Sequence, residues 1–175
     1  MNSLRDGLVC AVAAAAVAAC SPALDWRETR PEGMALVALM PCKPSVYARP
    51  VRLAGAAVPL ALYACSADGL TFALASADLG DATRVAAALA ELKAAALANV
   101  GAAAPTTLAL KVPGATPNPA SVRVALTGKL PDGKAVQEQV AVFVQGTRVF
   151  QATVIGPQLP AEVADTFFDG LHLAP

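Results

Sequence analysis

Charged side chains are scarce in this sequence, and neither sign predominates. They make up 15% of the 175 residues, and 13 basic residues balance 13 acidic ones, so the formal net charge at pH 7 is zero. Nucleic-acid binding depends on clustered Lys and Arg, so this balance argues against a nucleic-acid partner. The hydrophobic fraction of 56% is too high for a disordered chain. The length suits a single domain with a buried core.

Residue patterns for catalysis and metal binding are also scarce. The only histidine, His172, lies near the C-terminus, so a Ser-His-Asp triad would have no other base. Neither G-x-S-x-G nor a complete G-x-x-x-x-G-K-[ST] occurs. Asp165 and Asp169 are four residues apart and carry the oxygen ligands of calcium and magnesium, but exposed helix carboxylates are usually solvated. We therefore expect no enzymatic activity, no metal and no cofactor.

The other polar residues indicate ordinary surface. Four charged side chains near an expected turn at residues 131–133 are expected to pair on the surface: Lys129, Asp132, Lys134 and Glu138. Tyr47, Arg49 and Arg52 lie in a loop-rich stretch. They form either a small recognition patch or plain surface.

Long hydrophobic runs are missing as well. The apolar run Leu8–Ala16 is too short to span a bilayer, which takes about 20 apolar residues. It has the length of the apolar region of a secretory signal, and Arg5 precedes it. The run leads into Val17-Ala18-Ala19-Cys20, small residues before a cysteine.

This stretch resembles a bacterial lipobox. The resemblance implies cleavage before Cys20, a diacylglyceryl thioether on the Cys20 thiol and acylation of the new amine. Three acyl chains give a nearly permanent anchor in membrane lipid. Ser21 after the cysteine favours the outer membrane, with the domain facing the periplasm. Plain secretion after cleavage at Ala16-Val17-Ala18 is the alternative.

Two cysteines remain in the domain after such processing, Cys42 and Cys65. Because the periplasm permits disulfides, we expect a structural Cys42–Cys65 bond. A redox or metal-binding pair and two buried free thiols are the alternatives.

The chain then divides into a signal peptide (1–19), a tether (20–33) and one domain (34–175). Polar residues, prolines and a glycine favour a tether that holds the domain away from the bilayer. Trp26 in this tether is expected either at the membrane interface or against the flank of the domain.

Period-two alternation, turn residues and helical spacing predict the elements of the domain. Asp81 is the expected N-cap of an alanine-rich helix, and Pro160 opens a terminal helix. The expected strands are 34–40, 51–53, 58–65, 69–76, 106–112, 121–130, 135–145 and 147–155, and the first helix covers 81–100. Strands punctuated by helices predict an α+β fold, an antiparallel sheet sandwiched by helices.

Three motifs come in sequence along this pattern: G-x-L-P-D-G at 128–133, R-V-F-Q-A-T-V-I-G-P at 148–157 and A-D-T-F-F-D-G-L at 164–171. In this order they resemble the PsbP family of photosystem extrinsic subunits and many small bacterial envelope proteins. The resemblance implies a PsbP-like fold over roughly residues 34–173. It implies no catalytic residue.

The leading functional hypothesis is a non-enzymatic, lipid-anchored envelope protein with an accessory or partner-binding role, its partner an envelope protein. The alternative is a binding module for a small apolar ligand or a peptide held between sheet and helix. That alternative predicts a large pocket lined by Phe72, Phe143, Phe150 or Phe167.

Overall fold

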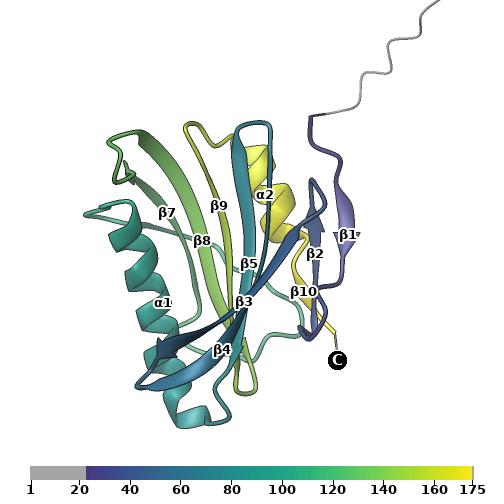
Figure 1. Ribbon diagram of the computed structural model, residues 1–175, viewed down its shortest axis with the longest axis vertical. Coiled ribbons are helices and arrows are strands. Elements are labelled where there is room, and N and C mark those ends of the chain that lie inside the picture. Colours follow the sequence, from purple (N-terminus) through teal and green to yellow (C-terminus); the bar gives the residue numbers. More distant parts are fainter. Residues whose placement is uncertain (1–22, 175) are drawn as a thin grey trace, which may run out of the picture.

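A seven-stranded antiparallel sheet and a three-stranded antiparallel sheet carry two α-helices in the computed structural model, which describes residues 23–174 (Figure 1). The expected α+β class is therefore confirmed. The elements in chain order are β1 (Arg27–Thr29), β2 (Leu36–Met40), β3 (Ser45–Leu53), β4 (Ala56–Ala67), β5 (Leu70–Asp78), η1 (Ala82–Arg84), α1 (Val85–Asn99), β6 (Thr106–Leu108), β7 (Val122–Lys129), β8 (Ala135–Gln145), β9 (Arg148–Gly156), α2 (Ala161–Asp169) and β10 (His172–Leu173).

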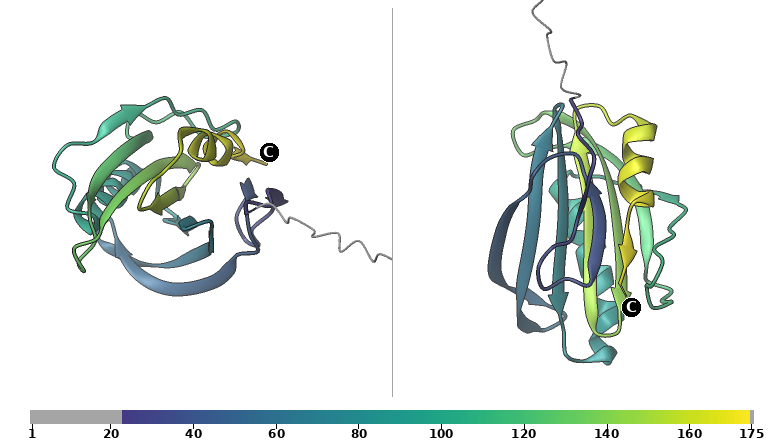
Figure 2. Two further views of the ribbon diagram at one scale, coloured as in Figure 1. Left: turned by 90° about the horizontal axis from the view of Figure 1, so that it is seen from above. Right: turned by 90° about the vertical axis from the view of Figure 1, so that its right-hand side faces the viewer.

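The large sheet has the strand order β3-β4-β5-β9-β8-β7-β6, and the small sheet has the order β1-β2-β10. The large sheet is strongly curved, and its blue strands, β3 and β4, form a wide arc when the molecule is seen from above (Figure 2). The expected 58–65/69–76 hairpin corresponds to β4 and β5, which are paired along most of their length. Asp68 and Gly69 have positive φ angles at the turn between them.

The two helices cover opposite faces of the large sheet, because alternate residues of each strand point to opposite sides. Val140, Val142 and Val149 pack in one core with Leu89 of α1. Phe143 alternates with these valines and packs in the other core, with Phe167 of α2 and with β2. The expected sheet between helices is therefore present.

Both ends of the long helical segment follow from its sequence. The Asp81 carboxylate accepts a hydrogen bond from the Thr83 amide at 2.8 Å and so caps η1, which leads directly into α1. Gly101 follows the helix with φ +60°, a conformation that glycine adopts without strain. Helix and sheet approach closely at Gly128, where an added Cβ would lie 1.9 Å from the Val100 carbonyl oxygen.

Part of the expected tether is folded. Residues 27–29 form β1, with Arg27 opposite Met40 and Thr29 opposite Ala38 of β2. Leu24 and Trp26 pack against the core on the α2 face. The domain therefore begins before residue 34, and Trp26 lies on its flank.

Besides β1, three strands differ most from the sequence prediction. β3 has nine residues where only 51–53 was expected; it is an edge strand, where Pro50 is tolerated because one row of its backbone groups needs no strand partner. β6 ends at Leu108 instead of residue 112. β10 has two residues and was not predicted. Within residues 23–174, no helix is long and apolar enough to cross a membrane.

Candidate functional site

The site expected at Cys20 lies outside the described residues, as does the signal peptide at 1–19. The structure shows instead where the chain joins the domain. The Asp25 amide donates a hydrogen bond to the Pro41 carbonyl oxygen at 3.1 Å, beside the loop that carries Cys42. The chain is therefore held to the domain within a few residues of Cys20.

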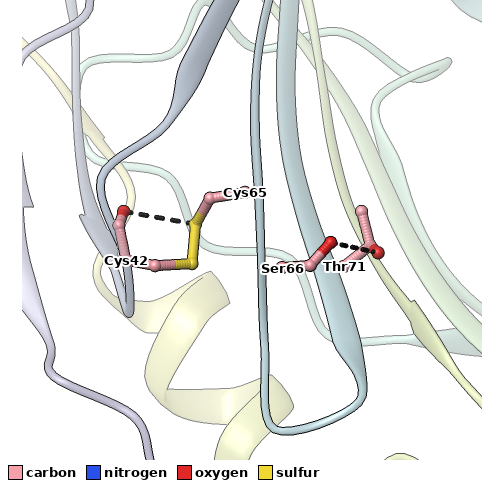
Figure 3. Close-up of a disulfide and its surroundings, with 4 residues drawn as sticks. All are labelled: Cys42, Cys65, Ser66 and Thr71. Carbon is pink, nitrogen blue, oxygen red and sulfur yellow. Dashed lines mark hydrogen bonds between the residues drawn. A yellow bond between two sulfur atoms is a disulfide. The ribbon is translucent and has the colours of Figure 1, made fainter.

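A disulfide joins Cys42 to Cys65, with their Cα atoms 6.0 Å apart (Figure 3). This separation lies in the ordinary range for a disulfide. The bond connects the loop after β2 to the end of β4, and thus the small sheet to the large one. Beyond it, the Ser66 and Thr71 hydroxyl oxygens lie 2.9 Å apart across the β4–β5 turn (Figure 3).

Three connections gather at the end of the molecule where residue 23 lies. They are the β4–β5 turn, the β7–β8 turn and the β9–α2 connection, all at the top of Figure 1. Ala23 and Ala67 line one open hollow of about 670 Å³ at this end. We call this end of the domain the N-terminal end.

A second hollow of about 510 Å³ lies between the three connections, and we call it the turn pocket. Its walls are mainly apolar, and Lys134 is its one charged residue. Its lining residues are Gly69, Thr71, Leu130, Lys134, Ala135, Val136, Ile155, Gly156 and Pro157. A Cβ added to Gly156 would lie 2.4 Å from the Leu70 Cδ2 atom and 3.0 Å from the Gly69 carbonyl oxygen, so β9 and the start of β5 approach closely here.

Glu138 lies next to the turn pocket and is not the surface residue that was expected. It follows Val136 on the same face of β8, and it is directly opposite Ile155 of β9. The residue is only 5% exposed, and its Oε2 atom has no hydrogen-bond partner. Burial raises the pKa of its carboxyl group to about 7. Of the four side chains expected to pair on the surface, Lys134 and Asp132 do so, with Nζ and Oδ2 2.8 Å apart.

The sequence contains the signal that Glu138 is buried. Val136, Glu138, Val140, Val142 and Val144 alternate with residues of the opposite face, so the glutamate continues a row of core valines. The charge of Glu138 suggested a surface position, whereas the two-residue alternation of β8 places its side chain on the core face.

Glu138 makes stability depend on pH. Its folded pKa of about 7 lies above the ordinary 4.5, so the unfolded chain loses this proton first as pH rises. The wild type should therefore lose stability between about pH 4.5 and 7. A pKa difference of this size corresponds to a loss of about 3 kcal/mol in the free energy of unfolding. Urea unfolding at pH 4 and pH 8 should show that Glu138→Gln removes it.

The matched control for this prediction is Asp132→Asn, since the Lys134 contacts lower the pKa of that exposed carboxyl group. This variant should be no more stable than the wild type at pH 8. Equal pH dependence in the wild type and in Glu138→Gln would show that the Glu138 carboxyl is not the cause.

Asp165 belongs to an ion pair. Its Oδ1 atom accepts a hydrogen bond from the buried Arg123 guanidinium at 2.8 Å, and Arg123 also binds Gln139. The Arg123 guanidinium lies 4.2 Å from the centre of the Phe168 ring. These contacts hold α2 against β7 and β8. Within the described range 23–174, no group of three or more His, Cys, Asp or Glu side chains is placed to hold a metal ion.

The remaining candidate residues, His172, Tyr47, Arg49 and Arg52, are exposed. His172 lies in β10, opposite Val37 of β2. Tyr47 and Arg49 lie on one face of β3, whereas Arg52 lies on the other, so the three do not make one patch.

The pocket predicted by the alternative hypothesis is present only in part: Phe143 lines an open hollow of about 350 Å³ with Leu110 and Val112, but no space lies between the rings themselves. Phe72, Phe143, Phe150 and Phe167 are all at most 1% exposed. Phe72 and Phe167 meet edge to face, with ring centres 5.4 Å apart, and Phe143 stacks on Phe150 at 5.2 Å. The rings fill the core. The turn pocket lies elsewhere, and sequence reasoning missed it because its walls come from three separate connections.

No protein-family model matches the sequence, and no curated protein matches it either.

Proposed function

We propose that this protein is a non-enzymatic, lipid-anchored envelope protein, a PsbP-like domain that Cys20 holds at the bacterial outer membrane, facing the periplasm. Its role is an accessory one toward another envelope component. The sequence Val17–Cys20 after a short apolar run supports the anchor, and the curved antiparallel sheet between two helices supports the fold resemblance.

The observation that carries the proposal is the sequence Val17–Cys20 after a short apolar run, and the structure adds that Cys20 lies close to the folded domain along the chain. Leu24 and Trp26 already pack on the core, and Asp25 is hydrogen-bonded to Pro41. Because consecutive Cα atoms are 3.8 Å apart, the Cα atoms of Cys20 and Ala23 are separated by at most about 11 Å.

An acyl anchor on Cys20 would therefore keep the domain directly at the bilayer surface, with its N-terminal end toward the lipid. The tether expected from the sequence would have let the domain stand away from the membrane. The folded position of residues 24–29 argues for close attachment instead.

The anchor is tested by growing cells with labelled palmitate. The wild type should take up the label and Cys20→Ala should not, because the thiol and the new amine at this residue are the acylation sites. The double variant Cys42→Ala/Cys65→Ala is the matched control and should be labelled like the wild type. An unlabelled wild type, or a labelled Cys20→Ala, would refute the anchor.

A further inference from the structure

The turn pocket differs from the other hollow at the N-terminal end in the chemistry of its walls. The hollow beside Ala23 is lined by four charged residues: Asp25, Arg27, Glu28 and Lys43. In the turn pocket, only Lys134 is charged. Its volume of about 510 Å³ lies in the range of sites for small ligands, which are mostly apolar with a few polar groups.

The inner side of the turn pocket is suited to an uncharged ligand group. Val136 and Ile155 continue into the core between sheet and α1, and Glu138 is the next residue inward on the same face. No cation pairs with Glu138 in the described part of the chain. Its pKa of about 7 leaves much of this carboxyl uncharged in neutral solution. A hydrocarbon chain beside it would face less charge than beside an ordinary glutamate.

The position of the turn pocket indicates where a ligand comes from. The pocket lies between the β4–β5 turn, the β7–β8 turn and the β9–α2 connection, at the same end of the molecule as residue 23 (Figure 1). If Cys20 is inserted in the bilayer, Ala23 at this end of the molecule lies within about 11 Å of Cys20 along the chain. Exposed apolar surface in that place is within reach of acyl chains.

We infer that the turn pocket takes one acyl chain of a phospholipid from the surrounding bilayer. The chain lies against Leu130, Val136 and Ile155, and the polar head stays at the rim near Lys134. This inference rests on the proposed anchor, because the anchor places the pocket at the membrane. Lipid held in this way would fix the orientation of the domain on the bilayer.

The test uses the full-chain protein purified from membranes and reconstituted in vesicles of phosphatidylethanolamine and phosphatidylglycerol. A small share of the phospholipid carries a photoreactive diazirine at the end of one acyl chain. After irradiation, mass spectrometry of the peptides locates the crosslinks. We expect them in residues 130–136 and 155–157.

Two variants probe the pocket walls, Ile155→Gln and Leu130→Gln. Each should lower crosslinking in these segments about tenfold, since an amide in an apolar site removes favourable contact with the chain. Leu130 lies outside the strands, so its variant tests the inference even if Ile155→Gln does not fold. Val46→Gln is the matched control, because Val46 is 57% exposed on β3 and lines none of the pocket.

Crosslinks concentrated in residues 23–44, or spread evenly over the surface, would overturn the inference. So would crosslinks in the turn pocket that neither glutamine variant lowers. An unlabelled turn pocket that holds the protein's own acyl chain would overturn it as well. Repeating the crosslinking with Cys20→Ala and the same photoreactive phospholipid in detergent micelles separates the claim of a lipid site in the turn pocket from the claim of an acyl anchor on Cys20. Labelling there without palmitate on the wild type would leave the pocket correct and the anchor wrong.

Discussion

Replacing Phe167 by alanine should lower the free energy of unfolding by about 3–5 kcal/mol, the usual cost of removing a large aromatic side chain from a core. Phe167 is completely buried, and its ring meets Phe72 edge to face at 5.4 Å and Phe168 at 5.2 Å. Phe72 in turn meets Trp26 at 5.7 Å. The rings thus join the N-terminal segment to α2 through one row of contacts.

Urea unfolding measured by the fluorescence of Trp26 tests this expectation, because Trp26 is the only tryptophan. Phe167→Leu is the control, since it keeps most of the apolar volume and should cost less than about 1.5 kcal/mol. The alanine variant should also loosen the N-terminal segment. Equal costs for the two variants would show that this ring does not hold the core together.

Removing the disulfide should lower the free energy of unfolding by about 3 kcal/mol, because the bond restricts the unfolded chain. The double variant Cys42→Ala/Cys65→Ala should show this loss without reductant. Beyond stability, it should increase hydrogen exchange at the Asp25 amide, which donates to Pro41 next to Cys42.

The wild type in dithiothreitol is the matched control for the disulfide. It should become as unstable as the double variant, whereas the double variant should not respond to the reductant. Two reactive thiols in the unreduced wild type would mean that the cysteines are not bonded in the cell.

Local patterns in the sequence predict most of the fold. The β4–β5 hairpin, the segment from Asp81 to Gly101 and the meander of β7, β8 and β9 all have turn or cap residues next to a clear hydrophobic period. These signals act within a few residues, so they can be interpreted without knowledge of the tertiary structure.

The missed elements depend on contacts between distant segments. β1 is only three residues long and contains two charges, and its pairing with β2 cannot be inferred from its own pattern. β10 has two residues and is likewise held by β2. β3 contains Pro50 and two arginines, which favour loop, yet an edge strand tolerates all three.

The candidate site residues likewise include some that the sequence predicts and some that only the folded chain brings together. Cys20 and the Cys42–Cys65 pair come from motif and cysteine count. The alternation of residues in β8 predicts that Glu138 is buried, but its charge led to the prediction of a surface position. The turn pocket has no sequence pattern, because Gly69, Leu130 and Pro157 meet only in the folded chain.

The central claim is that Cys20 is the lipidated first residue of the mature protein. Trypsin digestion of the protein from membranes, followed by mass spectrometry, tests it most directly. We predict a peptide of residues 20–27 that begins at Cys20 and carries the mass of its acyl chains. An unmodified peptide of residues 6–27, or an unmodified peptide that begins at Ala19, would contradict the claim.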